Sequence, residues 1–260
     1  MNAITELINL YNATQPGDTA HDIAEIMLQN LRQLRSLSID KIAGICFTSA
    51  ATLSRFARNL GYNTFSEFRS SLAASYENYP FLNHTMPPNR ELMEGQSFVH
   101  AYLCNLRSVL DQLESTLTPD LIGQISAAVS QAKKICFYSQ QIGDFPTIQF
   151  QYDLTMAGKT TVFLQKYEQQ LENARSLNAG CLVIVCLPDT PESSQRLEAL
   201  REARKHDARI LLIKPKTSTI GAKYADFVIN YDESRTATDG YIYDVIISLL
   251  TMHYRYNYMS

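Results

Sequence analysis

The sequence predicts two domains: an α-helical N-terminal bundle that contains a helix-turn-helix, and a three-layer, flavodoxin-like α/β domain with a five-stranded parallel sheet. Residues 1–77 show only the apolar spacing of helices, whereas from Lys133 onward short apolar runs alternate with helical stretches. Between these parts, residues 78–96 contain three prolines and little periodicity, so we assign them to a linker and 97–260 to the second domain. A length of 260 residues suits two domains of modest size.

The N-terminal part opens with two amphipathic helices separated by a turn. The first covers Ile4 to Tyr11, and the run Gln15-Pro16-Gly17 ends it because proline and glycine both disfavour a continuing helix. Asp18 or Thr19 then caps the second helix. Its apolar side carries Ile23, Ile26, Met27 and Leu31. The last helix of this part is expected from Tyr62 to about Tyr76.

Two short helices joined by a tight turn lie before that last helix. One runs from Ile39 to about Ile45 with Ser38 as its N-cap. The next begins after Ser49, whose hydroxyl can accept from the free amides that open a helix. Seven apolar residues fall where the two helices must face each other: Ile42, Ala43, Ala51, Leu53, Phe56, Ala57 and Leu60. This spacing is typical of a helix-turn-helix, whose second helix enters the major groove of DNA by its N-terminal end.

The outward side of the second helix supplies the candidate contacts to double-stranded DNA. They are Ser49, Ala50, Thr52, Ser54, Arg55 and Arg58, together with Lys41 on the first helix. We expect Thr52, Ser54 and Arg55 to read bases. Arg55 can pair with guanine O6 and N7 or with a phosphate, and Arg58 is placed to bind a phosphate. Ser49 caps the helix and can touch a phosphate beside it, while Lys41 either contacts the DNA backbone or is only solvated.

Charge is consistent with a specific DNA-binding protein rather than an indiscriminate polyanion binder. The whole chain has a net charge of −3, but the segment between positions 41 and 69 contains four basic residues and one acidic residue. So small a local charge predicts few phosphate contacts per protomer and a shallow dependence of DNA affinity on salt. One recognition helix with so little charge does not suffice to hold a specific site, so we expect a homodimer or higher homo-oligomer on a palindromic operator.

The C-terminal part begins with a helix from Ser97 to Leu117, and Thr118-Pro119 starts another with proline at its first position. Five apolar runs read as strands: 135–139, 160–165, 181–187, 209–214 and 227–231. Runs that are apolar on both faces and separated by helices predict a parallel sheet with both faces covered. A final helix from Tyr241 is more apolar than a surface helix should be. Its apolar residues, Ile242, Val245, Ile246, Leu249, Leu250 and Met252, are expected to form a self-complementary interface together with the stripe of the 97–117 helix.

The run from Ser49 to Phe68 resembles the N-terminal DNA-binding domain of RpiR-type transcriptional regulators. The residues that fit the pattern of that family are Ser49, Thr52, Arg55, Phe56, Leu60, Gly61, Tyr62, Phe65 and Phe68. The family usually joins this domain to a C-terminal sugar-isomerase-like (SIS) domain. A more moderate match to the SIS signature involves Ser218, Ala222, Ala225 and Asp226. The resemblance implies a regulator of sugar-related metabolism.

In SIS domains a sugar phosphate is held at the C-terminal ends of the strands by two loops. Here the loops read S-Q-Q-I-G-D-F-P (139–146) and C-L-P-D-T-P-E-S-S (186–194). Proline removes amide donors and the acidic residues repel a phosphate, so we expect sugar phosphates to bind weakly. Either a neutral or amino-bearing sugar-related effector binds here, or the loops are only solvated and the domain serves to dimerise. The candidate contacts are Ser139, Gln140, Gln141, Asp189, Thr190, Ser193 and Ser218.

No catalytic residue, cofactor or metal site is expected. Glu168, Glu192, His206 and Glu233 lie near strand ends but in no recognisable catalytic context, and the five cysteines form no CxxC pair. Buried thiols, the lack of a signal peptide and the lack of about 18 consecutive apolar residues predict a cytoplasmic protein without a membrane partner. The alternative is an SIS-domain sugar-binding or isomerising protein whose N-terminal helices only mediate protein contacts.

Overall fold

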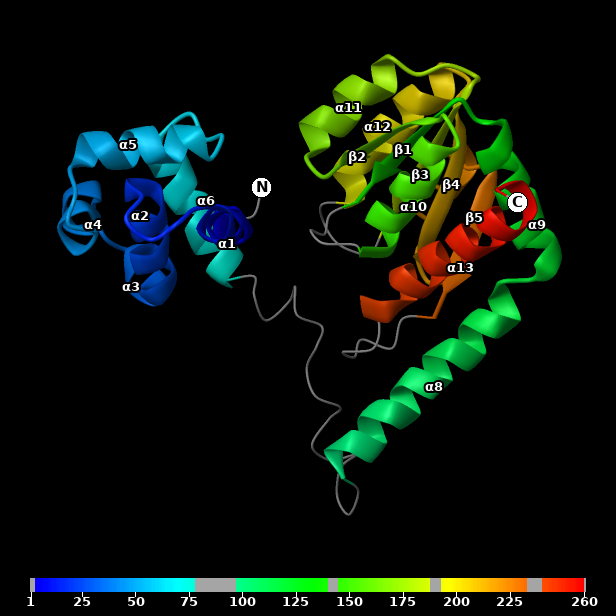
Figure 1. Cartoon of the computed structure of the whole chain (residues 1–260), viewed down its shortest axis with the longest axis horizontal. Helices are drawn as coiled ribbons and strands as arrows, with labels where there is room; N and C mark the ends of the chain where they lie inside the picture. The colour runs from blue at the N-terminus through cyan, green and yellow to red at the C-terminus, as the bar shows by residue number, and fades with distance from the viewer. Residues whose placement is uncertain (1–2, 78–96, 140–144, 188–192, 233–239, 260) are drawn as a thin grey trace. The chain divides into compact units, whose positions relative to one another are not determined.

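The computed structural model describes residues 3–77, 97–139, 145–187, 193–232 and 240–259 (Figure 1). Its contacts divide the chain into two compact units: unit 1, Met1–Asn83, and unit 2, His84–Ser260. The predicted linker, residues 78–96, lies outside the described residues. None of the described helices is both long enough and apolar enough to cross a bilayer.

Unit 1 is helical throughout its described part. Its helices are α1 (Ala3–Ala13), α2 (Thr19–Gln29), α3 (Leu31–Leu34), α4 (Ile39–Ile45), α5 (Ala50–Asn59) and α6 (Phe65–Glu77). The predicted second helix is shorter than expected because Asn30 ends it, and Leu31 starts α3 instead. The two helices of the predicted helix-turn-helix, α4 and α5, are confirmed, and Ser38 and Ser49 are their N-caps.

The last helix of unit 1 starts later than the sequence predicts. Tyr62 lies in the turn before α6, where Gly61 has a φ of 88°. The start of α6 is set by Thr64, whose Oγ1 accepts from the Glu67 N–H at 3.1 Å, while the Glu67 carboxylate accepts from the Asn63 N–H at 2.9 Å. Such reciprocal capping satisfies amides that the helix itself leaves unpaired.

The core of unit 1 takes one side from each helix. Its fully buried large side chains are Leu7, Met27, Leu34, Ile42, Leu53, Phe68 and Leu72. Phe68 of α6 meets the ring of Phe56 on α5 edge-on at 6.3 Å and that of Tyr62 at 5.3 Å. Aromatic rings prefer this geometry, so α6 fixes the position of α5.

Unit 2 is an α/β domain, as predicted. Its helices are α8 (Phe98–Thr116), α9 (Pro119–Gln131), α10 (Phe145–Met156), α11 (Tyr167–Arg175), α12 (Ser193–Lys205), the short η2 (Ala222–Tyr224) and α13 (Gly240–Tyr258). Its strands are β1 (Lys134–Tyr138), β2 (Thr160–Leu164), β3 (Cys181–Cys186), β4 (Arg209–Pro215) and β5 (Phe227–Tyr231). All five predicted strands are present, and their bounds differ from the prediction by at most one residue.

The strands form one parallel sheet in the order β2-β1-β3-β4-β5. In this doubly wound order, β2 is added on one side of β1, whereas β3, β4 and β5 are added one after another on its other side. The switch point of the sheet therefore lies between the carboxyl ends of β1 and β3. Ligands of open α/β sheets bind at such a switch point. Two of the predicted effector loops follow β1 and β3, so they start at this place.

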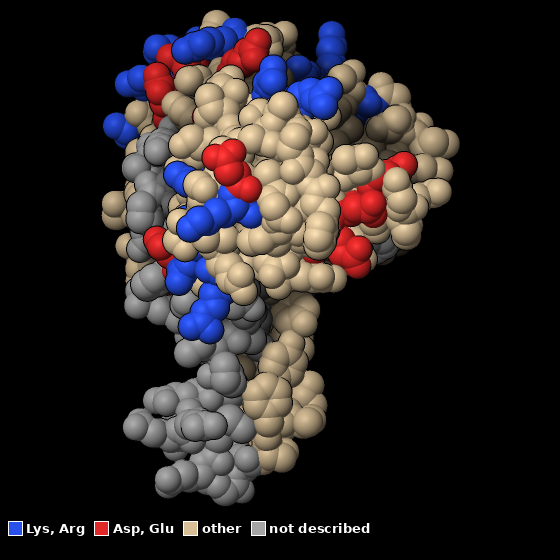
Figure 2. Space-filling model, turned by 90° about the vertical axis from the view of Figure 1, so that its left-hand side faces the viewer, with Lys and Arg blue, Asp and Glu red and all other residues tan. Residues whose placement is uncertain are grey.

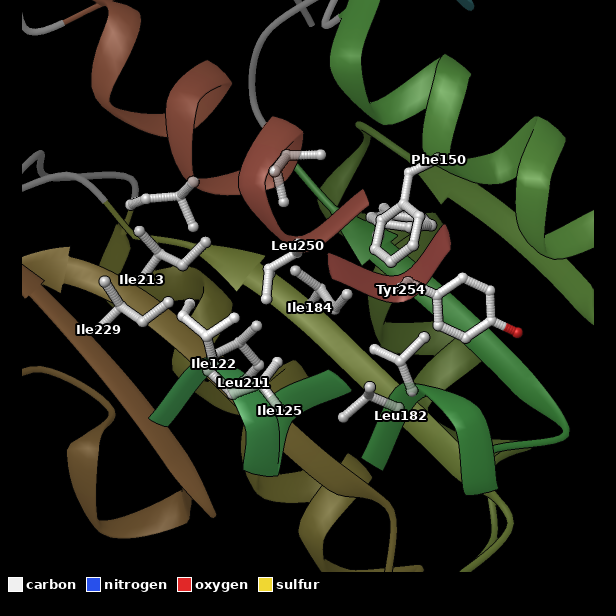
Figure 3. Packing of buried hydrophobic residues seen from close by; sticks show 14 of the residues in the cluster. Ile122, Ile125, Phe150, Leu182, Ile184, Leu211, Ile213, Ile229, Leu250 and Tyr254 are labelled. Atoms are coloured by element: carbon white, nitrogen blue, oxygen red, sulfur yellow. The ribbon is translucent and has the colours of Figure 1, made fainter. Parts of the chain in front are cut away.

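Alternate side chains of the strands pack into two separate cores, which makes three layers. One core contains Phe137, Ile184 and Ile213 from the sheet together with α8, α9, α10 and α13. Figure 3 shows Phe150 of α10 and Tyr254 of α13 next to each other in this core, with ring centroids 6.0 Å apart. The other core joins the opposite sides of the same strands to α11 and α12.

The apolar helix α13 has two sides with different partners. Ile242, Ile246 and Leu250 are buried against the sheet of unit 2, so their assignment to an interface between copies was wrong. Leu249 and Met252, in contrast, are 38 % and 54 % exposed. The first part of α8 extends beyond the sheet (Figure 1), and it exposes Phe98, Val99 and Leu103.

Candidate DNA interface and effector site

The N-terminus of α5 is held by the side chain of Ser49. The Thr52 N–H donates to Ser49 Oγ at 3.1 Å, and the hydroxyls of the two residues lie 2.9 Å apart. Ser49 is therefore the N-cap of α5, as the sequence predicts. The remaining amides of the first turn are unpaired within the helix, so this end favours a negatively charged partner such as a DNA phosphate.

The packing of α4 on α5 corrects one detail of the predicted orientation. Ala51, expected to face α4, is exposed, and Ala50, expected to point outward, is half-buried. The other predicted facing residues are buried: Ile42, Ala43, Leu53, Phe56, Ala57 and Leu60. The helix is thus turned by about one residue at its start, and Ala51 takes the exposed position expected for Ala50.

Three of the predicted DNA contacts on α5 project into solvent: Ser49, Arg55 and Arg58 are exposed, and Thr52 and Ser54 are half-buried. Ser54 donates its hydroxyl hydrogen to the Ala50 carbonyl at 2.9 Å, which leaves the oxygen only its acceptor capacity. Arg58 donates from Nε to the Ser54 carbonyl at 3.3 Å, so its side chain lies back along the helix. Arg55 is free of such a constraint among the described contacts, and this suits a residue that reaches for a base.

The basic residues around α5 do not form one continuous patch. Lys41 on α4 is exposed, but Arg69 on α6 donates from Nη1 to the Leu37 carbonyl at 2.8 Å and thereby fastens α6 to the residues before α4. The role of Arg69 is structural. In Figure 2 the blue Lys and Arg side chains of this side of the molecule stand in several groups, with red Asp and Glu side chains next to some of them.

Sequence reasoning missed Phe47 in the turn between α4 and α5. This phenylalanine is 91 % exposed and has a φ of 51°. A positive φ is disfavoured for a bulky side chain, so no sequence rule would place a phenylalanine there.

Of the predicted effector residues, Gln140, Gln141, Asp189 and Thr190 lie outside the described residues, as does the side chain of Ser193, whose backbone opens α12. The remaining two are both buried. Ser139 follows β1, and its N–H donates to the Leu164 carbonyl of β2 at 3.2 Å. Ser218 follows β4, and its hydroxyl accepts from the Ile220 N–H at 3.2 Å. No described contact brings these two serines together.

A buried polar network lies at the ends of β1 and β2, and sequence reasoning missed it. Gln170 of α11 is fully buried and donates from Nε2 to the Leu164 carbonyl at 2.8 Å and to the Ser139 carbonyl at 3.3 Å. Arg196, in the first part of α12, donates from Nη1 to Gln170 Oε1 at 3.2 Å. The amide is thus oriented by the guanidinium and fixes the backbone where the first predicted effector loop starts.

A second buried cation stands at the end of β4. Lys214 is 6 % exposed, and its Nζ donates to the carbonyl of Ser218 at 2.5 Å and to that of Pro215 at 3.3 Å. The ammonium group therefore folds the loop after β4 back on the strand. A lysine directly after the four apolar residues 210–213 of this strand was the sequence signal for this contact.

Asp226, part of the SIS-like signature, has a structural role. Its Oδ2 accepts from the Ile210 N–H of β4 at 2.9 Å, and Arg204 of α12 donates to both of its oxygens at 3.0 and 3.1 Å. Within the described residues, no group of three or more His, Cys, Asp or Glu side chains is arranged to hold a metal ion.

Known proteins resemble this chain over unit 1 and over most of its length. Residues 1–79 match the family described as a helix-turn-helix domain, rpiR family. The chain is 21 % identical over 229 residues to an uncharacterised HTH-type transcriptional regulator of Clostridium perfringens, which covers 87 % of this chain and 80 % of that protein. It is also 22 % identical over 196 residues to the HTH-type transcriptional regulator HexR of Pseudomonas aeruginosa, with 73 % and 65 % of the two chains covered.

Two solved structures share the fold. The NanR protein of Vibrio vulnificus, solved in complex with ManNAc-6P, matches with a TM-score of 0.55 and 15 % identity over 99 % of this chain and 93 % of that chain. The sugar isomerase domain of an RpiR transcription factor from Sphaerobacter thermophilus matches with a TM-score of 0.50 and 16 % identity, over 59 % of this chain and 87 % of that one. Unit 1 of this chain therefore belongs to the rpiR family of helix-turn-helix domains, and it is joined to an α/β unit with the fold of sugar-isomerase domains.

Proposed function

We propose that the protein is a transcriptional regulator of sugar-related metabolism that binds a palindromic DNA operator through α5. The observation that carries this proposal is the arrangement of α5 itself. One side of the helix is buried against α4 and α6, its N-terminus is capped by Ser49, and the opposite side exposes Arg55 and Arg58. A recognition helix needs this arrangement, because only its N-terminal end and one face can reach base edges in a major groove.

Within this proposal the residues of α5 have different tasks. Arg55 pairs with a guanine edge in the major groove, and Thr52 and Ala51 contact neighbouring bases. Ser49, Arg58 and Lys41 contact phosphates and so set the position of the helix without selecting a sequence. Ser54 contributes only an acceptor oxygen, because its hydrogen is already donated to Ala50.

Unit 2 supplies a dimer interface in this proposal. An open, mostly apolar surface depression of about 360 Å³ lies on α13 and is lined by Asp244, Val245, Ser248, Leu249 and Met252. The neighbouring helix α10 exposes Ile148, Tyr152 and Met156. Contiguous exposed apolar residues of this kind mark protein interaction sites, and a second copy of the chain would cover them while pairing two α5 helices on one operator.

Effector sensing is assigned to the carboxyl edge of the sheet. Ser139 directly follows β1 and so lies beside the switch point of the sheet, where ligands of this fold bind. The fold neighbour NanR was solved with ManNAc-6P, which supports a sugar-related effector here. The prolines and acidic residues of the loops favour a neutral or amino-bearing molecule over a phosphorylated one.

DNA binding is tested by selecting duplexes from a random-sequence library with the full-length protein and measuring the affinity for the enriched duplex by fluorescence anisotropy. We expect a two-fold symmetric site and an affinity at least 1,000-fold above that for random duplex at about 100 mM salt. Failure to enrich any sequence would favour the alternative that unit 1 only mediates protein contacts.

A further inference from the structure

The turn between α4 and α5 presents an aromatic side chain that folding does not explain. Phe47 is 91 % exposed, more than any other large hydrophobic residue in the described part of the chain. Its side chain belongs to neither the core of unit 1 nor the residues that pack against that core. Its φ of 51° lies in the left-handed region, which a bulky L residue occupies only under strain.

The backbone at Phe47 follows a common way of ending a helix. The Thr48 N–H donates to the Ala43 carbonyl at 2.9 Å, and the Phe47 N–H donates to the Gly44 carbonyl at 3.3 Å. These two bonds define a Schellman motif, in which the residue just past the helix adopts positive φ and is usually glycine. Three other helices of this chain end with the same pair of bonds, at Gly61 after α5, Gly158 after α10 and Asp207 after α12.

Phe47 differs from the residues at the same place after the other three helices. The other three positions carry glycine or aspartate, which adopt positive φ at little steric cost. Phe47 adds strain and exposes an apolar ring to water without gaining buried surface. A residue that lowers stability in this way points to a role outside folding, since strained residues gather at binding sites.

Phe47 precedes the N-cap Ser49 by two residues, so it stands at the end of α5 that would enter the major groove. A duplex offers apolar surface at this place from two sources, the C5 methyl group of thymine and the carbon face of a deoxyribose. We propose that Phe47 is a DNA-contacting residue whose ring packs on such an apolar part of the operator, beside the base-reading Arg55. This inference rests on the proposed function of α5.

The test replaces Phe47 by glycine in the full-length protein. Phe47→Gly removes the ring and suits the backbone, so the melting temperature should stay the same or rise, whereas the affinity for the selected duplex should fall about 5- to 30-fold. Phe47→Leu keeps apolar bulk and should lose less. Asp207→Gly is the matched control: it makes the same backbone change after α12 in unit 2 and should leave DNA affinity unchanged.

Changes in the DNA distinguish a contact to a thymine methyl group from a contact to a deoxyribose. Each thymine of the half-site is replaced in turn by deoxyuridine, which lacks only the methyl group. If Phe47 contacts a methyl, one replacement weakens the wild-type protein but has no further effect on Phe47→Gly, as in a double-mutant cycle. If the ring packs on a deoxyribose, Phe47→Gly loses affinity equally on every one of these duplexes.

Wild-type affinity of Phe47→Gly for the selected duplex would overturn the inference and leave the proposed function standing. A loss of affinity accompanied by a lower melting temperature would also overturn it, because the residue would then act through folding. Absence of selective binding by the wild-type protein would instead contradict the proposed function, and the inference would fail with it.

Discussion

Asp153 on α10 and Arg255 on α13 form a two-bond ion pair between the helices that cover one face of the sheet. Arg255 donates from Nε to Asp153 Oδ2 at 2.5 Å and from Nη2 to Oδ1 at 2.9 Å. The hydrogen bond to Asp153 raises the pKa of Arg255 above its usual value, so the guanidinium stays charged. The carboxylate is only 5 % exposed and depends on this partner.

Arg255→Ala should therefore destabilise unit 2, because it leaves a buried carboxylate without its main donor. We expect a loss of about 1–3 kcal/mol in the free energy of unfolding, measured by urea denaturation. Lys216→Ala is the control: it breaks a 2.6 Å pair with Asp232 in which both side chains are exposed. Such a surface pair contributes little, so equal losses in the two variants would contradict the assigned role of Asp153.

Arg55→Ala should weaken binding to the selected operator by about 1–3 kcal/mol and relax the preference for one base pair in each half-site. Its affinity for random duplex should change much less. Arg58→Ala is the comparison, since a phosphate contact is lost on every sequence alike. Circular dichroism should not change in either variant because both side chains are exposed. If the two variants lose the same factor on both duplexes, Arg55 is a phosphate contact.

Dimerisation should depend on the exposed side of α13. The double variant Leu249→Glu, Met252→Glu places two charges in the apolar depression on that helix, and desolvating them opposes association. We expect a dimer mass in light scattering for the wild-type protein at micromolar concentration and a monomer mass for the variant. Arg201→Glu, on the exposed surface of α12, should leave the dimer intact. A monomeric wild-type protein would rule out this assembly.

Effector binding should appear as thermal stabilisation, because a ligand at 100 times its Kd adds about 2.7 kcal/mol to the folded state. We expect larger shifts from unphosphorylated or amino-bearing sugars than from their phosphates. Ser139→Ala and Thr190→Ala should reduce the shift. A strong shift from a sugar phosphate would show that the acidic, proline-containing loops still accept an anion, and silence across the panel would leave dimerisation as the task of unit 2.

The stability of unit 2 should fall with rising pH through Asp244. Burial raises the pKa of this carboxyl group in the folded state, so the folded protein retains its proton in the pH range just above the ordinary value of an aspartate, about 3.9. In that range the folded state binds more protons than the unfolded one, and stability decreases as pH increases. Asp244→Asn should remove this slope and gain stability at neutral pH. Parallel urea titrations from pH 4 to pH 7 measure it, and parallel slopes in both proteins would contradict the assignment.

The strands and the helix-turn-helix could be predicted because their signals are local. The run from Cys181 to Cys186 is apolar at each position, short and rich in β-branched residues, as a strand covered on both faces requires. Ser49 predicts the start of α5 because N-capping depends only on residues within one helical turn. Local signals cannot identify the partner of an apolar surface. The apolar spacing of α13 predicted that one side is buried, but it could not show that the sheet of the same unit, and not a second copy, covers Ile242.

The features that the sequence did not reveal depend on contacts between distant residues or on backbone angles. Arg196 and Gln170 meet only because α11 and α12 pack side by side. That Ala51 and not Ala50 is exposed depends on how α5 packs against both α4 and α6. The positive φ of Phe47 could not be predicted because the left-handed conformation favours glycine, and a phenylalanine occupies it here.

The order of the sheet determines how the chain can fold during synthesis. Strand β1 is made first, yet both of its neighbours, β2 and β3, come later in the sequence. Until they emerge from the ribosome, the apolar residues of β1 and both of its backbone edges have no partner strand, a state that invites aggregation. Unit 1 is built from helices with short connections and can fold before any strand exists. A nascent chain would thus carry a folded helix-turn-helix unit before the strand β3, which the α/β unit needs to fold, has been made.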